Sequence, residues 1–337
     1  MSTKIIAVTG ATGAQGGGVI NIMKNVPGWK IRAITRNPSS DSAVRLSQSG
    51  IEVVRADFDD EASLVKAFEG VHAIFAVTNW WEYLFSGKTQ DEAGAIEEEQ
   101  GMKLARAAAQ TSTLENYIWS SLPSAKTITG GKLTVPHMDY KANVDVRIKA
   151  DMPQLAAKTT YLLFGYYPAN MAFLPMMKPL ELVCTAHNSA FGNLLTPFKP
   201  ASGQYVQIAP TRPDAKVLNA GDVSVNPGIW VRQILASGSK ARGKNVNLAL
   251  EKLTFQEMMD IWSEVTGKKG TVMTCSLDDY KKIWGVGGYE FGLQLQFGEL
   301  CDPWAETEDF VTPKELGIKP EEVVGFRGTI EGLKAHF

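Results

Sequence analysis

The sequence predicts an α/β protein with a doubly wound parallel sheet, a Rossmann fold, and a smaller C-terminal α/β substrate lobe. Short apolar runs alternate with helical patterns over the first half of the chain. A glycine-rich turn follows the first of these runs, Ile5–Val8. The composition of the chain changes after about Pro168. Residues 175–222 are rich in Pro, Gly and Asn, and helical patterns resume after them. Alternation of strands and helices gives parallel strands joined by crossover helices.

The predicted strands are short runs of apolar or β-branched residues. They lie at 5–8, 29–35, 51–55, 73–77, 117–120 and 161–164. The predicted helices between them often end at a glycine. They lie at 17–24, 42–49, 62–68, 95–110 and 138–149. Because the ligand crevice of such a sheet lies at the carboxyl ends of its strands, the residues that follow each strand are candidates for a site.

The second half of the chain is expected to form a smaller lobe, interleaved with the first half. Short β-like pieces such as 205–208 precede helices at 225–236, 254–265 and 276–284, the second of which opens on a capping box. The run Gly285–Gly292 holds four glycines, so we expect a flexible lid over an apolar ligand and no regular helix or strand. The predicted domains are a Rossmann domain, 1–168, and a substrate-binding lobe, 169–337.

Composition narrows the functional classes. The 337 residues are 44% hydrophobic, enough for a sizeable core, and the net charge of −2 with no basic stripe predicts no nucleic-acid partner. Cys184, Cys275 and Cys301 are far apart and form no C-x-x-C, which favours reduced thiols in a cytoplasmic protein and no metal site. The first strand begins by Lys4, which leaves no room for a signal peptide, and no apolar run is long enough to cross a membrane.

The turn Thr9–Gly16 has the spacing G-x-x-G-x-x-G that suits a dinucleotide diphosphate. Gly10 permits a sharp turn, Gly13 lets a diphosphate approach the backbone amides, and Gly16 lets the next helix pack close to the strand. The helix N-terminus offers free N–H groups and a positive dipole end to phosphates. The turn residues expected to bind the cofactor are Gly10, Thr12, Gly13, Ala14, Gln15 and Gly16.

The residues after the second and third strands are expected to contact the adenosine end of a cofactor. NAD-binding sites carry an acid after the second strand, whereas this chain has Arg36. A guanidinium can pair with a 2′-phosphate, so the predicted cofactor is NADP. Asp57 and Phe58 follow the third strand. Asp57 either accepts a hydrogen bond from the adenine amino group or caps a helix.

The residues after the fourth and fifth strands are expected beside the diphosphate and ribose. Thr78 and Asn79 follow the fourth strand, and Ser120 ends the fifth. Trp80 and Trp81 come next to Asn79 in what we expect to be a loop, where two adjacent tryptophans cannot easily both be buried. We therefore expect them to contact a substrate.

Several segments, in the expected order, closely resemble the NmrA-like family, an atypical branch of the short-chain dehydrogenase/reductase fold. They are Gly10–Gly18, Thr35–Pro38, Val77–Glu82 and His137–Lys141, and the likeness runs from residue 4 to about 170. The resemblance implies an NADP(H)-binding Rossmann domain and a small C-terminal lobe. It also implies one of two roles, since the family holds both redox-sensing regulators and true reductases, with enzymes of fungal specialised metabolism near it.

The predicted catalytic helix departs from the Tyr-x-x-x-Lys of active short-chain reductases. His137 stands at the first position and Lys141 four residues later on the same helix face, while Tyr140 points about 100° away from Lys141. We expect Lys141 to hold the nicotinamide ribose, with its charge serving the cofactor and not the fold. His137 either donates a proton with a pKa near neutral or only packs at the helix start. Glu99 stands where similar proteins can carry a cofactor-binding lysine.

The loop after the last predicted strand, Gly165–Asn170, is expected to pass over the nicotinamide. Its residues expected near the cofactor are Tyr166, Tyr167, Pro168 and Asn170. The residues expected to bind an apolar substrate are aromatic, namely Trp80, Trp81, Tyr167 and Tyr289. Hydride transfer requires a cavity that opens onto the nicotinamide.

Two functions stay open from the sequence. One is an NADP(H)-dependent oxidoreductase acting on a bulky apolar molecule, with a proton from His137, from a tyrosine of the 166–167 loop or from water. The other is a non-catalytic NADP(H) redox sensor that docks on a transcription factor. Aromatic residues and a long 180–220 connection favour the enzyme, whereas the missing tyrosine favours the sensor.

Overall fold

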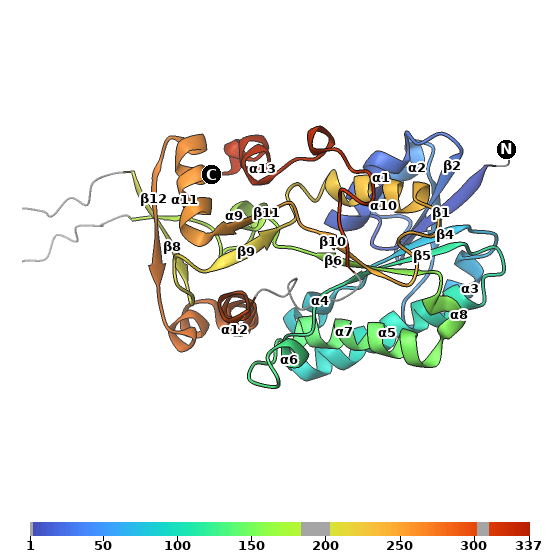
Figure 1. The fold of residues 1–337 in the computed structure, drawn as a ribbon, viewed down its shortest axis with the longest axis horizontal. Helices are drawn as coiled ribbons and strands as arrows, with labels where there is room; N and C mark the ends of the chain where they lie inside the picture. The colour runs from blue at the N-terminus through green and yellow to red at the C-terminus, as the bar shows by residue number, and fades with distance from the viewer. Residues whose placement is uncertain (1–2, 183–202, 302–309) are drawn as a thin grey trace, which may run out of the picture.

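The computed structural model describes residues 3–182, 203–301 and 310–337, with a large parallel sheet at their centre (Figure 1). The strand order is β13-β10-β6-β5-β4-β1-β2-β3, and all neighbouring pairs run parallel. The strands of this sheet are β1 (Lys4–Val8), β2 (Trp29–Thr35), β3 (Glu52–Arg55), β4 (Ala73–Ala76), β5 (Asn116–Ser121), β6 (Thr159–Phe164), β10 (Asn245–Leu248) and β13 (Phe310–Val311). The predicted α/β class is confirmed. Because β2 and β4 lie on opposite sides of β1, strand addition reverses there, and a ligand crevice is expected at that point.

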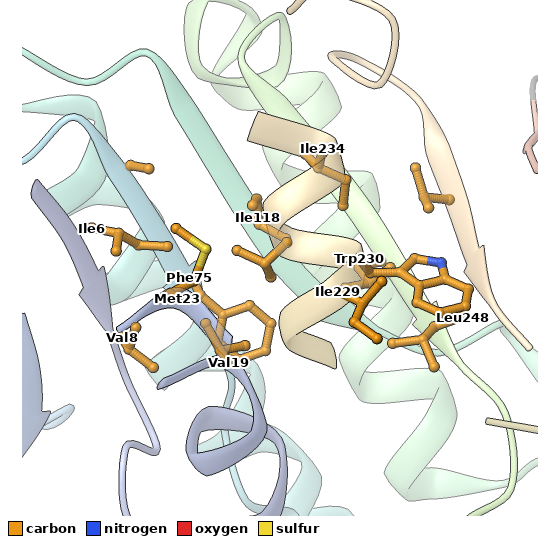
Figure 2. Close-up of a cluster of buried hydrophobic side chains, with 14 of the residues drawn as sticks. Ile6, Val8, Val19, Met23, Phe75, Ile118, Ile229, Trp230, Ile234 and Leu248 are labelled. Atoms are coloured by element: carbon orange, nitrogen blue, oxygen red, sulfur yellow. The ribbon is translucent and has the colours of Figure 1, made fainter. Parts of the chain in front are cut away.

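Helices cover both faces of the sheet, as a doubly wound fold requires (Figure 1). One face carries α1 (Ala14–Met23), α2 (Asp41–Gln48) and α10 (Asn226–Ala236). The other carries α3 (Glu61–Ala67), α5 (Gln90–Ala109), α7 (Pro136–Asp151) and α8 (Pro153–Ala156). Figure 2 shows the first of these two cores. Its labelled side chains come from α1, α10 and the strands between them, and they are Ile6, Val8, Val19, Met23, Phe75, Ile118, Ile229, Trp230, Ile234 and Leu248.

Two glycines let α1 approach α10 and the loop before it. A Cβ on Gly18 would lie 2.2 Å from the carbonyl oxygen of Val223, and a Cβ on Gly228 would lie 2.5 Å from that of Gly18. Any larger side chain at either position would push the two segments apart. Helix α10, from the second half of the chain, is therefore packed directly onto α1, the helix that follows the glycine turn.

The remaining second-half elements form a smaller lobe with its own buried cluster. One small sheet pairs β11 (Glu251–Thr254) with β9 (Lys216–Asn219), and another has the order β12 (Lys269–Thr274), β8 (Gln204–Ala209) and β7 (Leu180–Glu181). The longer helices here are α11 (Phe255–Thr266), α12 (Leu277–Leu300) and α13 (Phe326–Gly332). Short helices complete the described chain, namely α4 (Trp80–Phe85), α6 (Ala125–Ile128), α9 (Asn170–Phe173), η1 (Pro320–Glu322) and η2 (Lys334–His336).

The expectation of a flexible, non-helical lid at residues 285–292 is wrong. The segment belongs to α12, which bends only at Gly285, where φ is 67°. Its other glycines serve close packing instead of flexibility. A Cβ on Gly287 would lie 2.8 Å from the ring of Phe85, and one on Gly292 would lie 2.5 Å from Leu277.

The predicted start of the helix at 95–110, which is α5 in the structure, is also wrong, by five residues. The helix begins at Gln90 because Thr89 and Glu92 form a capping box, in which each side chain bonds the backbone N–H of the other residue. In the described ranges, no helix has the length and apolar character to cross a membrane, and no group of three or more His, Cys, Asp or Glu side chains is suited to hold a metal. Cys184 lies outside the described residues.

Candidate functional site

The glycine turn after β1 has the backbone geometry that its sequence predicts. Gly10 has a φ of 57°, in the left-handed region that favours glycine, and its carbonyl accepts a hydrogen bond from the N–H of Gly13 at 2.9 Å. A Cβ on Gly16 would lie 2.3 Å from the same carbonyl oxygen. Gly16 thus allows the first turn of α1 to sit directly on the turn that precedes it.

The N-terminus of α1 is available to an anion. Its N-cap, Gly13, has no side chain to bond the first N–H groups, and the first turn carries no acidic residue. The leading N–H groups of a helix have no acceptor within the helix, and they point along the positive end of its dipole. This arrangement suits a diphosphate.

A cavity of about 660 Å³ opens at this point, at the carboxyl ends of the strands on both sides of β1. Most of the predicted site residues meet in its walls. They are Gly10, Thr12, Gly13, Ala14, Gln15, Gly16, Arg36, Phe58, Thr78, Asn79, Trp80, Trp81, Ser120, His137, Lys141 and Tyr167. The structure therefore brings together residues from seven separate stretches of sequence.

Other predicted site residues lie outside this cavity. The carboxylate of Asp57 accepts from the N–H of Asp59 at 3.0 Å, and Asp60, not Asp57, caps α3. Tyr289 lies under the ammonium of Lys281, 4.6 Å from the centre of its ring. The others are Tyr166, which lines a second cavity, and Pro168 and Asn170, which line neither cavity.

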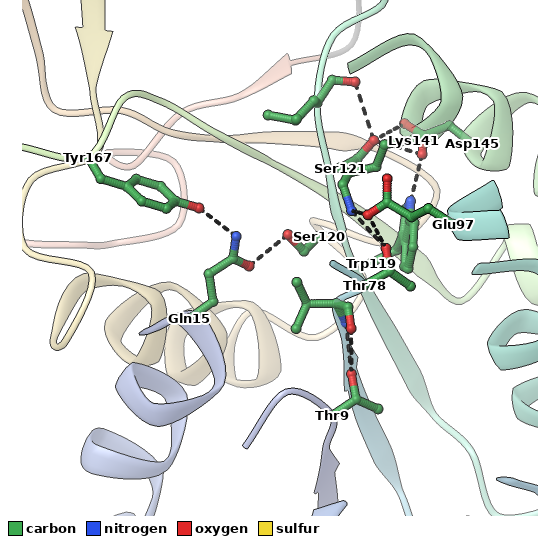
Figure 3. A network of polar contacts seen from close by, with 12 residues as sticks. Thr9, Gln15, Thr78, Glu97, Trp119, Ser120, Ser121, Lys141, Asp145 and Tyr167 are labelled. Carbon is green, nitrogen blue, oxygen red and sulfur yellow. Dashed lines mark hydrogen bonds and ion pairs between the residues drawn. The ribbon is translucent and has the colours of Figure 1, made fainter. Parts of the chain in front are cut away.

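A chain of hydrogen bonds crosses the larger cavity (Figure 3). The Gln15 amide donates to the hydroxyl of Tyr167 at 2.6 Å and accepts from the Ser120 hydroxyl at 2.7 Å. These hydrogen bonds connect α1, β5 and the loop after β6. Burial raises the pKa of Tyr167 to about 12, so its hydroxyl keeps its proton at neutral pH.

Lys141 is part of a buried ion pair, which the sequence did not predict (Figure 3). Its Nζ lies 2.7 Å from Oε1 of Glu97 and 2.8 Å from Oγ1 of Thr78. Glu97 is 1% exposed, and its other carboxylate oxygen has no hydrogen-bond partner. The Lys141 charge is thus already paired within the protein, whereas we expected it to serve the cofactor and not the fold. No pattern singles out Glu97 among the three consecutive glutamates of α5.

Behind Lys141, the carboxylate of Asp145 is the centre of a second polar cluster. It accepts from the hydroxyl of Ser121 at 2.7 Å and from the indole N–H of Trp119 at 2.8 Å. Asp145 is half-buried. This burial raises the pKa of Asp145 to about 7, against the opposing effect of the Ser121 hydrogen bond.

Both ring nitrogens of His137 are bonded to the C-terminal lobe. Nδ1 lies 2.6 Å from Oε1 of Glu290, and Nε2 lies 3.2 Å from Oε1 of Gln294. The backbone N–H of His137 also donates to Glu290, at 2.9 Å, and the rings of Trp80 and Trp81 pack within 6 Å of the imidazole. Glu290 is fully buried. Sequence reasoning missed it because it lies in the glycine run that we expected to be a lid.

Arg36 also has a protein partner. Its Nη1 and Nη2 lie 2.7 and 2.9 Å from the two carboxylate oxygens of Glu82, and both side chains are exposed. These hydrogen bonds raise the pKa of Arg36 further above neutral. Glu82 stands in the Val77–Glu82 segment, but nothing in the sequence pairs it with Arg36.

Trp80 and Trp81 lie in a helix, α4, so the expectation of a loop is wrong. Trp80 is 2% exposed and its indole donates to the carbonyl of Gln90 at 3.2 Å, while Trp81 is partly buried. Tyr140 points away from the cavity, as expected, because its ring packs on Gly94 of α5. Glu99 pairs with Arg106 at 2.7 Å.

A second cavity, of about 300 Å³, lies between the Rossmann half and the lobe. Leu122 lines both cavities, and Tyr166 and the α12 residue Gln294 line the second. Its walls mix apolar residues with five charged ones, Arg212, Asp214, Lys216, Lys252 and Glu299. The apolar residues are Leu122, Pro123, Met138, Phe164, Ala215, Val217, Leu218 and Phe297. Of the residues expected to bind an apolar substrate, Trp80, Trp81 and Tyr167 line the larger cavity, Tyr289 lines neither cavity, and none lines the second.

Comparisons with known proteins agree with this arrangement. A profile of the NmrA-like family matches residues 2–313. The NmrA-like family domain-containing oxidoreductase hkm9 of Aspergillus hancockii is 29% identical over 310 residues, which cover 86% of each chain. The structure of NmrA, a negative transcriptional regulator, in complex with NADP has a TM-score of 0.67 at 25% identity and covers 99% of this chain and 91% of that one. The NADPH-dependent quinone oxidoreductase QOR2 of Escherichia coli shares the fold, with a TM-score of 0.66, 22% identity, and coverage of 97% and 99%.

Proposed function

Because this chain belongs to the NmrA-like family, we propose that it is an NADP(H)-dependent oxidoreductase acting on a bulky apolar small molecule. Relatives across most of its length are named oxidoreductases. Two of these relatives come from Aspergillus species, and a role in fungal specialised metabolism, which the sequence resemblance implies, is part of the proposal. The expected cytoplasmic location remains a prediction.

The observation that carries the proposal is the larger cavity, where a bare helix N-terminus, Arg36 and Lys141 lie in one crevice. The absence of a Cβ on Gly13 and the uncapped N–H groups of α1 suit a diphosphate. Arg36 suits a 2′-phosphate. Solved relatives of this fold hold NADP or NADPH, which supports the same cofactor here.

We assign to Lys141 the binding of the nicotinamide ribose. An ammonium has three N–H donors, and the contacts with Glu97 and Thr78 use two of them. The third is left for a ribose hydroxyl. Glu97 and Thr78 thereby fix the position of Lys141 before the cofactor arrives, which lowers the entropy lost on binding.

The proposed place of the substrate is the region where the second cavity meets the larger one, at Leu122, so that the substrate reaches the side of the larger cavity on which Tyr167 lies. The apolar part of the second cavity's wall, which includes Met138, Phe164 and Phe297, would exclude water from the reacting atoms. NADPH, when bound, supplies a hydride to the substrate. We assign the proton to Tyr167, since its hydroxyl accepts from Gln15 and so keeps its own hydrogen for a substrate atom. His137 is a weaker candidate because both its ring nitrogens already bond protein groups.

The redox-sensor function is a second candidate, favoured by one observation. His137 replaces the tyrosine of active short-chain reductases, and it is engaged in joining α7 to α12. The regulator NmrA has a similar fold. A sensor needs cofactor binding and a partner surface, but no substrate cavity.

Two measurements test the proposal. Titration calorimetry with NADP and NAD should show tighter NADP binding, and Arg36→Ala should remove about ten- to a hundredfold of NADP affinity, the contribution of a charge-assisted pair. The consumption of NADPH is then followed with a panel of apolar quinones, imines and ketones. Turnover of any of these acceptors by the parent chain supports the enzyme. Tight NADP(H) binding without turnover on any acceptor favours the sensor.

A further inference from the structure

We propose that Glu82 sets the discrimination between NADP and NAD, by competing with the 2′-phosphate of the cofactor for the guanidinium of Arg36. The inference rests on the proposed cofactor and deepens it. Glu82 would be a specificity-determining residue. Arg36 alone would give a strong preference for NADP over NAD, and Glu82 would reduce that preference.

The geometry of the pair is the first argument. Nη1 of Arg36 lies 2.7 Å from Oε1 of Glu82, and Nη2 lies 2.9 Å from Oε2. Both terminal nitrogens of the guanidinium thus bond to one carboxylate, in a bidentate ion pair. Both residues line the larger cavity, so the pair lies within the proposed cofactor site.

The position of the pair in the fold is the second argument. Arg36 follows β2, whereas Glu82 belongs to α4, which follows β4. Strands β2 and β4 flank β1, the strand that leads into the glycine turn. The ion pair therefore joins the two sides of the crevice in which the cofactor is proposed to lie.

The chemistry of the guanidinium is the third argument. Its planar fork binds a carboxylate and a phosphate with the same two-pronged geometry, so the edge formed by Nη1 and Nη2 serves one of them at a time. A 2′-phosphate that takes this edge has to displace Glu82, and it then lies near a second negative group. The ribose 2′-hydroxyl of NAD is neutral and can donate to a carboxylate, so NAD binding does not incur this cost.

The size of the effect follows from the exposure of the pair. The side chains of Arg36 and Glu82 are 55% and 41% exposed, and exposed ion pairs are weak. We expect Glu82→Gln to tighten NADP binding by about two- to fivefold. NAD affinity should stay unchanged or fall slightly.

Titration calorimetry on the full chain tests the proposal, with NADP and NAD as ligands. The variants are Glu82→Gln, Arg36→Ala and the double variant. Glu52→Gln is a matched control, since Glu52 of β3 pairs with Arg32 of β2 at 2.9 Å and neither residue lines the cavity. The expected result is a gain in NADP affinity from Glu82→Gln that disappears in the Arg36→Ala background and is absent in Glu52→Gln.

Three outcomes would overturn the inference. They are an unchanged or weaker NADP affinity in Glu82→Gln, an equal gain in Glu52→Gln, and a full gain that persists without Arg36. The last would mean that Glu82 acts through general repulsion and not through competition. The proposed function fails separately, if Arg36→Ala leaves NADP affinity intact. A loss in Arg36→Ala with no effect of Glu82→Gln would contradict the Glu82 role alone.

Discussion

The ammonium of Lys141 lies 2.7 Å from a carboxylate oxygen of Glu97, and both side chains are withdrawn from solvent. A residue proposed to bind the cofactor thus also neutralises a buried acid. The pair couples the stability of the Rossmann half to its proposed function, because neither charge can be removed without leaving the other buried.

Lys141→Ala should lower the free energy of unfolding by about 3–5 kcal/mol, the usual loss when one partner of a buried pair is removed. The double variant Lys141→Ala/Glu97→Gln should recover part of that loss, because no buried carboxylate remains unpaired. Urea unfolding of both variants measures this. Equal stability of Lys141→Ala and the parent chain would show that the pair is not structural.

Gly16→Ala should damage the glycine turn, whereas Gly17→Ala should not. A Cβ on Gly16 meets the backbone of Gly10 at 2.3 Å, while one on Gly17 has 3.9 Å to its nearest neighbour. The first change should cost about 1–3 kcal/mol and weaken NADP binding. The second should be neutral or stabilise α1 by about 0.5–1 kcal/mol, since alanine favours a helix. Thermal unfolding and calorimetry compare the two, and similar losses in both would contradict the role of Gly16.

The raised pKa of Asp145 predicts a pH-dependent stability. A carboxyl with a folded pKa of about 7 binds its proton more tightly in the folded chain than in the unfolded one. The protonated Asp145 carboxyl therefore makes its full contribution to the stability of the fold below about pH 4. This contribution is lost as the pH rises towards 7. Asp145→Asn should remove this slope of the unfolding free energy, whereas Asp151→Asn, an exposed position on the same helix, should keep it. A slope unchanged in Asp145→Asn would contradict the assignment.

Tyr167→Phe separates proton donation from cofactor binding. The ring stays and only the hydroxyl is lost, so NADP affinity should change by less than about threefold. Turnover should fall by about 10²–10⁴, the usual contribution of a general acid. Steady-state kinetics with an accepted substrate measures this. Undiminished turnover would mean that the proton comes from water or from His137 and not from Tyr167.

Glu290→Ala should destabilise the chain without weakening the cofactor site. The change leaves the backbone N–H and Nδ1 of His137 without their buried acceptor, which costs about 1–3 kcal/mol for each unpaired group. Glu290→Gln keeps an acceptor and should cost less. NADP affinity should hold in both variants, because Glu290 does not line the larger cavity. A loss of affinity equal to that of Lys141→Ala would show that Glu290 belongs to the cofactor site.

Much of the fold and of the larger cavity could be predicted because their signals are local. Gly10, Gly13 and Gly16 lie within one turn, and Arg36 lies one residue after its strand. Parallel strands then bring such strand-end residues together without further information.

The partners that neutralise these residues could not be predicted, because each comes from a distant element. Glu82, Glu97 and Glu290 lie between 44 and 153 residues from the side chains they bind. Side-chain pairing across such separations depends on how helices cross, and no short sequence pattern encodes that. The glycines of α12 misled the prediction for a related reason, since a glycine that a neighbour needs for close packing resembles one that frees a loop.

The interleaving of the two halves decides how this chain can be divided in the laboratory. Strands β10 and β13 continue the sheet beyond β6, and α10 covers α1. Expression of residues 1–168 alone would leave β6 as an uncovered edge strand with apolar faces, which is a template for aggregation. Such a fragment should be insoluble, so binding studies and truncation series need the two halves together, supplied either as one chain or as co-expressed fragments that reassemble.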